Sequence, residues 1–122
     1  MKDFLKYHAP ALFYAILILI LSSTSRMNPS GLEIEGLDKI AHFLEYAIFA
    51  VLVFRSFMHL SSKISLKLAV ILSFVFIILF AIADETYQSY VPGRDSSIYD
   101  IIFDLLGSFL ILFFLWFRHK RK

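Results

Sequence analysis

The chain contains no cysteine and few charged residues. Of its 122 residues, 18% are charged and 59% are hydrophobic, whereas soluble domains average about 25% charged and about 45–50% apolar residues. The absence of cysteine excludes disulfides, thiolate chemistry and cysteine-based zinc sites. The sequence also lacks a glycine-rich phosphate loop, an internal repeat and a low-complexity segment. We expect a single domain over residues 1–122, with lipid solvating most of its surface.

Four apolar stretches are candidates for membrane-spanning helices, each of which needs about 20 mainly apolar residues. The expected spans cover residues 10–23, 38–57, 66–87 and 97–117. The first has the shortest apolar core, and its basic and serine-rich flanks also resemble a cleavable signal peptide. Ser96 and Ser97 are expected to cap the first turn of the fourth span. The fold class predicted is all-α, a polytopic membrane protein with a four-transmembrane-helix bundle.

The basic residues predict the orientation of these spans, because lysine and arginine collect on the cytoplasmic side of membrane proteins. One side would carry Lys2, Lys6, Arg55, Lys63, Lys67, Arg118, Lys120, Arg121 and Lys122, and the other only Arg26, Lys39 and Arg94. We therefore expect both termini and the 58–66 loop in the cytoplasm (N-in/C-in), and the 24–37 and 86–96 loops outside. The basic tail follows an apolar run directly, which indicates anionic lipid headgroups rather than nucleic acid as its partner.

Polar residues gather where the second and fourth spans begin and where the third ends. In the second span, residues at helical spacing share one face over about two turns. The three groups are Asp38, His42, Glu45 and Tyr46; Asp84, Glu85 and Gln88, with Arg94 after a Pro92-Gly93 turn; and Asp100, Asp104 and Gly107. The expected orientation brings all three to the outer face. Ionisable groups at span depth cost about 2.5–3.5 kcal/mol each on insertion scales, so we expect mutual pairing, a wet cavity, or both.

These motifs resemble those of the VanZ-like family of small bacterial membrane proteins. The family stretch Asp-Lys-x-x-His-Phe-x-x-Tyr is present as Asp38, Lys39, His42, Phe43 and Tyr46. The stretch Asp-Glu-x-x-Gln-x-Phe-x-Pro-x-Arg with a further aspartate is present as Asp84, Glu85, Gln88, Pro92, Arg94 and Asp100, with Tyr90 in place of the phenylalanine. Asp104 stands where we expect asparagine and adds a possible charge. The resemblance implies the bacterial inner (cytoplasmic) membrane and an association with lowered susceptibility to the glycopeptide antibiotic teicoplanin.

The polar residues suit acid–base chemistry and substrate binding. Histidine titrates near neutral pH, and Asp38 one turn away is expected to orient His42. The predicted catalytic residues are His42, Asp38, Glu85, Asp84 and Asp100, and the predicted substrate-binding residues are Arg94, Gln88, Lys39 and Tyr46. The planar guanidinium of Arg94 suits a phosphate or a carboxylate; the competing interpretation is an ion pair with Asp95 or with a carboxylate in a span.

A metal ion is the less favoured interpretation of the carboxylates. Asp84, Glu85, Asp100 and Asp104 offer the oxygen ligands that hard divalent cations prefer. A single nearby histidine and the absence of a His-Glu-x-x-His motif argue against zinc. The basic side chains of Lys39, His42 and Arg94 would also neutralise these carboxylates without any metal. We assign no metal residue and no cofactor.

Two hypotheses about function follow. The first is an outward-facing polar site that acts on or binds a cell-envelope component, with membrane lipids and an amphipathic or lipid-linked precursor as partners and no nucleic acid. The alternative is a non-catalytic binding or structural protein whose polar cluster serves as interhelical packing. The residues leave open whether a reaction is catalysed, and they indicate no oligomeric state.

Overall fold

The computed structural model describes residues 1–24 and 36–121, which form one short π-helical turn and four α-helices. These elements are η1 (Phe4–His8), α1 (Ala9–Ser23), α2 (Leu37–Met58), α3 (Leu66–Gln88) and α4 (Ile98–Lys120). Arg26 and Lys122, both used for the orientation, and residues 25–35 of the predicted 24–37 loop lie outside the described residues.

All four helical segments are long and apolar enough to cross a membrane, which confirms the predicted all-α, four-span class. The first candidate span covers Phe4–Ser23, 20 residues with a mean hydropathy of 1.8. It begins six residues earlier than predicted because the π-helical turn runs directly into α1. Pro10 lies in the first turn of α1, and because it has no backbone N–H it cannot bond to a carbonyl of the preceding π-helical turn.

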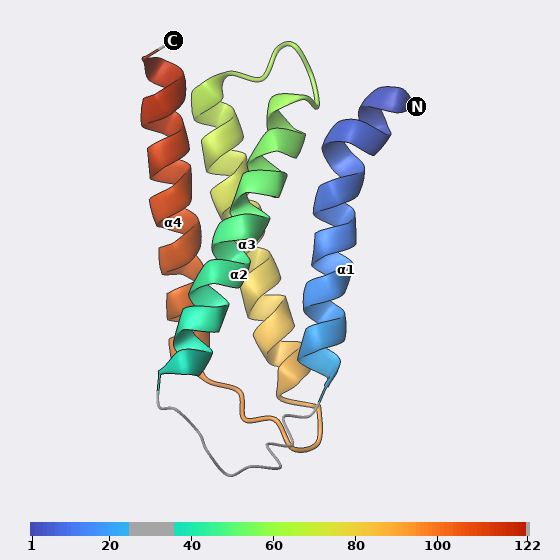
Figure 1. Ribbon diagram of the computed structural model, residues 1–122, viewed down its shortest axis with the longest axis vertical. Coiled ribbons are helices and arrows are strands. Elements are labelled where there is room, and N and C mark those ends of the chain that lie inside the picture. The colour runs from blue at the N-terminus through green and yellow to red at the C-terminus, as the bar shows by residue number, and fades with distance from the viewer. Residues whose placement is uncertain (25–35, 122) are drawn as a thin grey trace.

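The helices run up and down along one axis (Figure 1). α1 and α3 end, and α2 and α4 begin, at the same end of the bundle, the lower end in Figure 1, which we call the site end. Both chain termini lie at the opposite end. This arrangement brings together the three polar groups that the sequence places at these helix ends.

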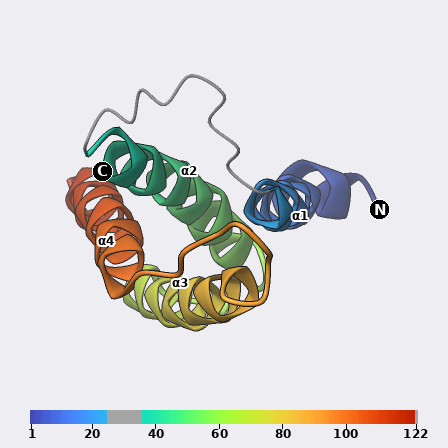
Figure 2. The same cartoon turned by 90° about the horizontal axis from the view of Figure 1, so that it is seen from below.

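α1 is the peripheral helix of the bundle. Figure 2 shows α2, α3 and α4 grouped closely, with α1 outside them, and the most extensive helix–helix contact is between α2 and α4. Side-chain hydrogen bonds link the first span to α2 near its start and to α3 at its end. His8 Nδ1 lies 2.7 Å from Ser56 Oγ on α2, and Ser23 Oγ lies 2.9 Å from Tyr87 OH on α3.

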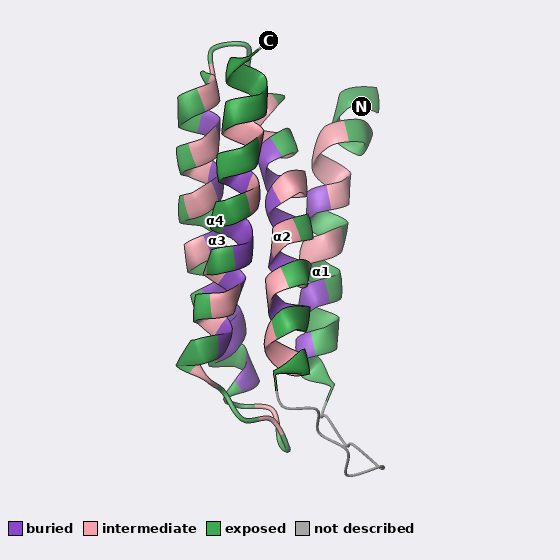
Figure 3. Cartoon of the chain, turned by 60° about the vertical axis from the view of Figure 1, so that its left-hand side comes forward, coloured by how far each residue is buried: buried purple, intermediate pink, exposed green. Residues whose placement is uncertain are grey.

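The core lies between the facing sides of the helices, where the buried residues gather (Figure 3), and many large hydrophobic residues are exposed on the outer faces. On α3, four residues at four-residue spacing, Ala69, Ser73, Ile77 and Ala81, are fully buried. Three of them are small, so the neighbouring helices can pack closely against α3. Leu79 and Phe114 are 63% and 57% exposed, which is typical of lipid-facing positions in a spanning bundle.

α2 and α4 approach each other most closely at Gly107. A Cβ atom added there would lie 2.1 Å from the backbone oxygen of Phe43, so no larger residue fits without moving a helix. One residue further on, Ser108 Oγ donates a hydrogen bond to the Tyr46 carbonyl oxygen at 3.3 Å. The approach also brings Asp104, three residues before Gly107, next to His42.

Replacing Gly107 by alanine is expected to separate α2 from α4 and to lower the free energy of unfolding by about 1–3 kcal/mol, as overpacking does elsewhere. The measurement is the unfolding free energy in detergent micelles, followed by helical circular dichroism. Leu110→Ala is the matched control, since Leu110 lies on the same helix and is 52% exposed. Equal stability of Gly107→Ala and the unsubstituted chain would show that the close approach is not required.

Candidate functional site

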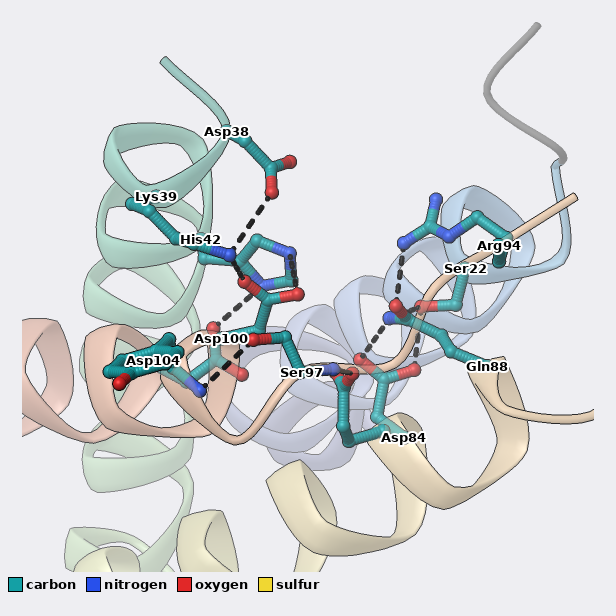
Figure 4. Close-up of polar contacts among 12 residues, drawn as sticks. Ser22, Asp38, Lys39, His42, Asp84, Gln88, Arg94, Ser97, Asp100 and Asp104 are labelled. Carbon is teal, nitrogen blue, oxygen red and sulfur yellow. Dashed lines mark hydrogen bonds and ion pairs between the residues drawn. The ribbon is translucent and has the colours of Figure 1, made fainter. Parts of the chain in front are cut away.

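The polar residues at the site end form two hydrogen-bonded groups, shown in Figure 4. We call the first, between α2 and α4, the charge-paired cluster; it consists of Asp38, Lys39, His42, Asp100 and Asp104. We call the second, between α1, α2, α3 and the loop before α4, the arginine network; it consists of Ser22, Tyr46, Asp84, Gln88 and Arg94. The two groups together contain eight of the nine predicted site residues, and Glu85 is the ninth.

In the charge-paired cluster, each basic side chain contacts two carboxylates. The Lys39 ammonium forms ion pairs with Asp38 and with Asp100. His42 Nδ1 lies 2.9 Å from Asp104 Oδ1, and His42 Nε2 lies 3.7 Å from Asp100 Oδ2. Because both ring nitrogens face carboxylate oxygens, the geometry suits a doubly protonated imidazolium. An imidazolium has no free lone pair, so the ring would have to lose a proton before it could accept one from a substrate.

The histidine partner differs from the predicted one. Asp38 was expected to orient His42 from one turn away, but the carboxylate that bonds to the ring is Asp104 of α4. The reason is the close approach of α2 and α4 at Gly107. His42 and Asp104 are 4% and 1% exposed, and buried charges are tolerated only when they are paired and hydrogen-bonded.

The charge-paired cluster also contains the three side chains best placed to ligate a metal. The ligand atoms of Asp38, His42 and Asp100 lie within 4.8 Å of one another. The Lys39 ammonium bonds to both of these carboxylates, so a divalent cation would compete with a positive charge of the chain itself. We assign no metal to this position.

In the arginine network, uncharged side chains donate hydrogen bonds to Asp84. Asp84 accepts hydrogen bonds from Ser22 Oγ at 2.6 Å and from Tyr46 OH at 3.1 Å. Gln88 Nε2 donates to Ser22 Oγ at 2.9 Å, and Arg94 Nη2 donates to Gln88 Oε1 at 2.6 Å. A continuous chain of hydrogen bonds thus runs from the core tyrosine to the loop arginine.

Among the described residues, neutral oxygen atoms accept the hydrogen bonds of Arg94. Besides Gln88, its guanidinium donates to the backbone oxygens of Leu21 at 3.5 Å and of Thr24 at 3.4 Å, at the carboxyl end of α1. A cation there interacts favourably with the helix dipole. Within residues 1–24 and 36–121, no carboxylate forms an ion pair with Arg94. The alternative of an ion pair with Asp95 or a span carboxylate therefore has no contact of that kind among these residues.

A cavity of about 410 Å³ lies between α1 and α2 beside Arg94. Its lining combines polar and apolar side chains: Tyr14, Ser22, Thr24, His42, Glu45, Gln88 and Arg94 with Leu21, Ala41 and Ile48. Of the predicted substrate-binding residues, Arg94 and Gln88 line the cavity, whereas Lys39 and Tyr46 do not. Of the predicted catalytic residues, only His42 lines it.

Two polar residues of the site escaped the sequence analysis. Ser22 bonds to Asp84 and Gln88 and is 4% exposed, but it had been considered only as the end of a span or part of a cleavage region. Tyr14 lines the cavity from the middle of α1. A serine in the last turn of a span, at the end that carries the other polar residues, is the sequence signal for such a residue.

Glu85 accepts a hydrogen bond from the backbone at the start of α4. Its Oε1 accepts a hydrogen bond from the backbone N–H of Ser97 at 2.5 Å, and the Ser97 hydroxyl accepts one from the N–H of Tyr99 at 3.2 Å. The predicted serine cap of the fourth span is therefore confirmed for Ser97. Glu85 is 6% exposed, and its Oε2 has no hydrogen-bond partner among the described residues.

Comparison with known proteins supports the resemblance seen in the sequence. Residues 3–119 match the VanZ/LLP1 family, which covers nearly the whole chain. No match was found among curated proteins or among solved structures.

The bond between Asp104 and His42 predicts a difference between two substitutions. Asp104→Asn keeps an oxygen acceptor for His42 Nδ1–H and is expected to cost less than about 1 kcal/mol of unfolding free energy, whereas Asp104→Ala leaves a buried donor unpaired and is expected to cost about 1–3 kcal/mol. Unfolding in detergent micelles measures both. If asparagine destabilised the chain as much as alanine, the acceptor at this position would not be what stabilises the cluster.

Proposed function

The chain belongs to the VanZ/LLP1 family, and we propose that it binds the anionic group of an amphipathic cell-envelope component at Arg94. Candidate ligands are phospholipids and lipid-linked precursors, which carry phosphate at the membrane surface. The observation that carries the proposal is the guanidinium beside the cavity, which has no carboxylate partner among the described residues.

The chemistry of Arg94 supports an oxyanion as the ligand. A guanidinium has five N–H donors in a planar fork that matches phosphate and carboxylate oxygens. Its present acceptors are neutral oxygens of Gln88, Leu21 and Thr24, and hydrogen bonds between charged groups are roughly twice as strong as those between neutral ones. An anion in the cavity would therefore gain a charge-assisted bond without breaking an ion pair of Arg94 within residues 1–24 and 36–121.

The charge-paired cluster supports the alternative role, interhelical packing, for its own part of the site. Lys39, Asp100, His42 and Asp104 satisfy one another across α2 and α4. We propose that this cluster holds the helices while the arginine network receives the ligand. An acid–base role for His42, Asp38, Asp84, Glu85 and Asp100 stays a prediction, and among them His42 lies at the cavity.

We also propose that the site end faces outward across the bacterial cytoplasmic membrane, as the distribution of basic residues predicts. The chain has no cysteine, so single cysteines can be introduced as reporters. Ser96→Cys, in the loop before α4, should react with a membrane-impermeant maleimide in intact cells. Ser61→Cys, between α2 and α3, should react only after permeabilisation. The reverse labelling pattern would contradict the orientation.

Arg94→Gln is expected to reduce the phospholipid that co-purifies with the protein by about tenfold or more, because a bond to a charged group contributes about 1.5–3 kcal/mol. Arg94→Lys, which keeps the charge but not the planar fork, should retain part of it. Phosphorus analysis of the detergent-purified protein measures the bound lipid. In cells, expression of the chain should lower teicoplanin susceptibility, as the family resemblance implies, and Arg94→Gln should remove that effect.

Lys67→Gln is the matched control, since Lys67 is an exposed cation at the opposite end of the bundle. It should change neither the bound phosphorus nor the teicoplanin response. If Arg94→Gln and Lys67→Gln retained equal amounts of phospholipid at equal levels in the membrane, a ligand-binding role for Arg94 would be excluded.

A further inference from the structure

The cavity beside Arg94 and His42 also contains a carboxylate in its lining, which the proposed function does not use. Glu45 of α2 lines the same cavity, so the lining includes one guanidinium and one carboxylate. An ionised carboxylate within a span is costly, by about 2.5–3.5 kcal/mol on insertion scales. A carboxylate has about four acceptor sites, so a carboxylate can bond to a donor of the protein and to a donor of a ligand at the same time.

The cavity is placed to meet lipid from the side. α1 lies outside the group formed by α2, α3 and α4 (Figure 2), and the cavity lies between α1 and α2. Two of its apolar lining residues, Leu21 of α1 and Ile48 of α2, are 49% and 52% exposed within their spans. A ligand with a hydrocarbon tail can therefore leave the tail in the bilayer while its headgroup enters the cavity.

From these observations we infer that the cavity takes the zwitterionic headgroup of a phospholipid bearing a primary amine, with the phosphate at Arg94 and the ammonium at Glu45. This inference rests on the proposed function and narrows its ligand class. The cavity volume of about 410 Å³ falls within the range of about 300–1,000 Å³ that is typical of small-molecule sites.

Lipids with three types of headgroup allow the roles of Arg94 and Glu45 to be tested separately. A primary ammonium donates N–H bonds to a carboxylate, whereas a quaternary ammonium has no N–H to donate. A glycerol headgroup carries the same phosphate and no cation, so it would meet Arg94 but find no partner charge at Glu45. Phosphatidylethanolamine should therefore bind better than phosphatidylcholine or phosphatidylglycerol with the same acyl chains.

The test uses the full chain in mixed micelles with equimolar amounts of these three lipids, and native mass spectrometry counts the bound lipids. We expect a several-fold excess of phosphatidylethanolamine adducts over the other two. Glu45→Gln should bring the ratio of phosphatidylethanolamine to phosphatidylglycerol close to one, and Arg94→Gln should lower the adducts of all three lipids. Asp3→Asn and Lys67→Gln, exposed at the opposite end, should change neither the ratio nor the total.

The outcomes separate this inference from the proposed function. If Arg94→Gln lowers all adducts but phosphatidylethanolamine shows no excess, or an excess that survives Glu45→Gln, the zwitterionic headgroup is ruled out and the proposed function stands. If Arg94→Gln changes no adduct, both fail. Free phosphoethanolamine carries the same two charges without acyl chains, so displacement of the lipid by an equimolar amount of it would show that the tail contributes nothing and would contradict the uptake of a lipid from the side.

Discussion

The cost of placing ionised side chains among apolar helices governs the arrangement of the whole site end. Asp84, Asp100 and Asp104 are all 4% exposed or less, in a bundle whose outer surface is mainly apolar. A buried charge is tolerated when other charges or well-placed hydrogen-bond donors compensate it. Each of these carboxylates therefore limits where the neighbouring helix can lie, because that helix must supply a charge or a hydrogen-bond donor.

The chain meets this cost in two different ways. Between α2 and α4, lysine and histidine neutralise aspartates directly, and the missing side chain of Gly107 allows the backbones to come close enough for these contacts. Between α1 and α3, hydroxyl and amide donors satisfy Asp84, and among the described residues the hydrogen bonds of the Arg94 guanidinium go to neutral carbonyl oxygens. The first arrangement is closed, and the second keeps a cation beside a cavity.

Periodicity and charge were sufficient to predict the four spans, the Ser97 cap and the meeting of the polar groups at one end. These features depend on local patterns along the chain, such as the Asp38, His42 and Tyr46 spacing on one helical face. The partners across helices were not predictable in the same way. Whether His42 meets Asp38 or Asp104 depends on how closely α4 approaches, and the role of Ser22 depends on how α1 is rotated against α3. Neither quantity is contained in the spacing of one helix.

The central claim is that an anionic group of a membrane amphiphile occupies the cavity beside Arg94. Solid-state nuclear magnetic resonance can measure it directly, through dipolar coupling between lipid phosphorus and the guanidinium of isotope-labelled arginine in bilayers. We expect a phosphorus atom on the order of 4 Å from the Arg94 guanidinium, as a charge-assisted hydrogen bond requires, and loss of that coupling in Arg94→Gln. Phosphorus coupling to the arginines at the opposite end, with none to Arg94, would contradict it.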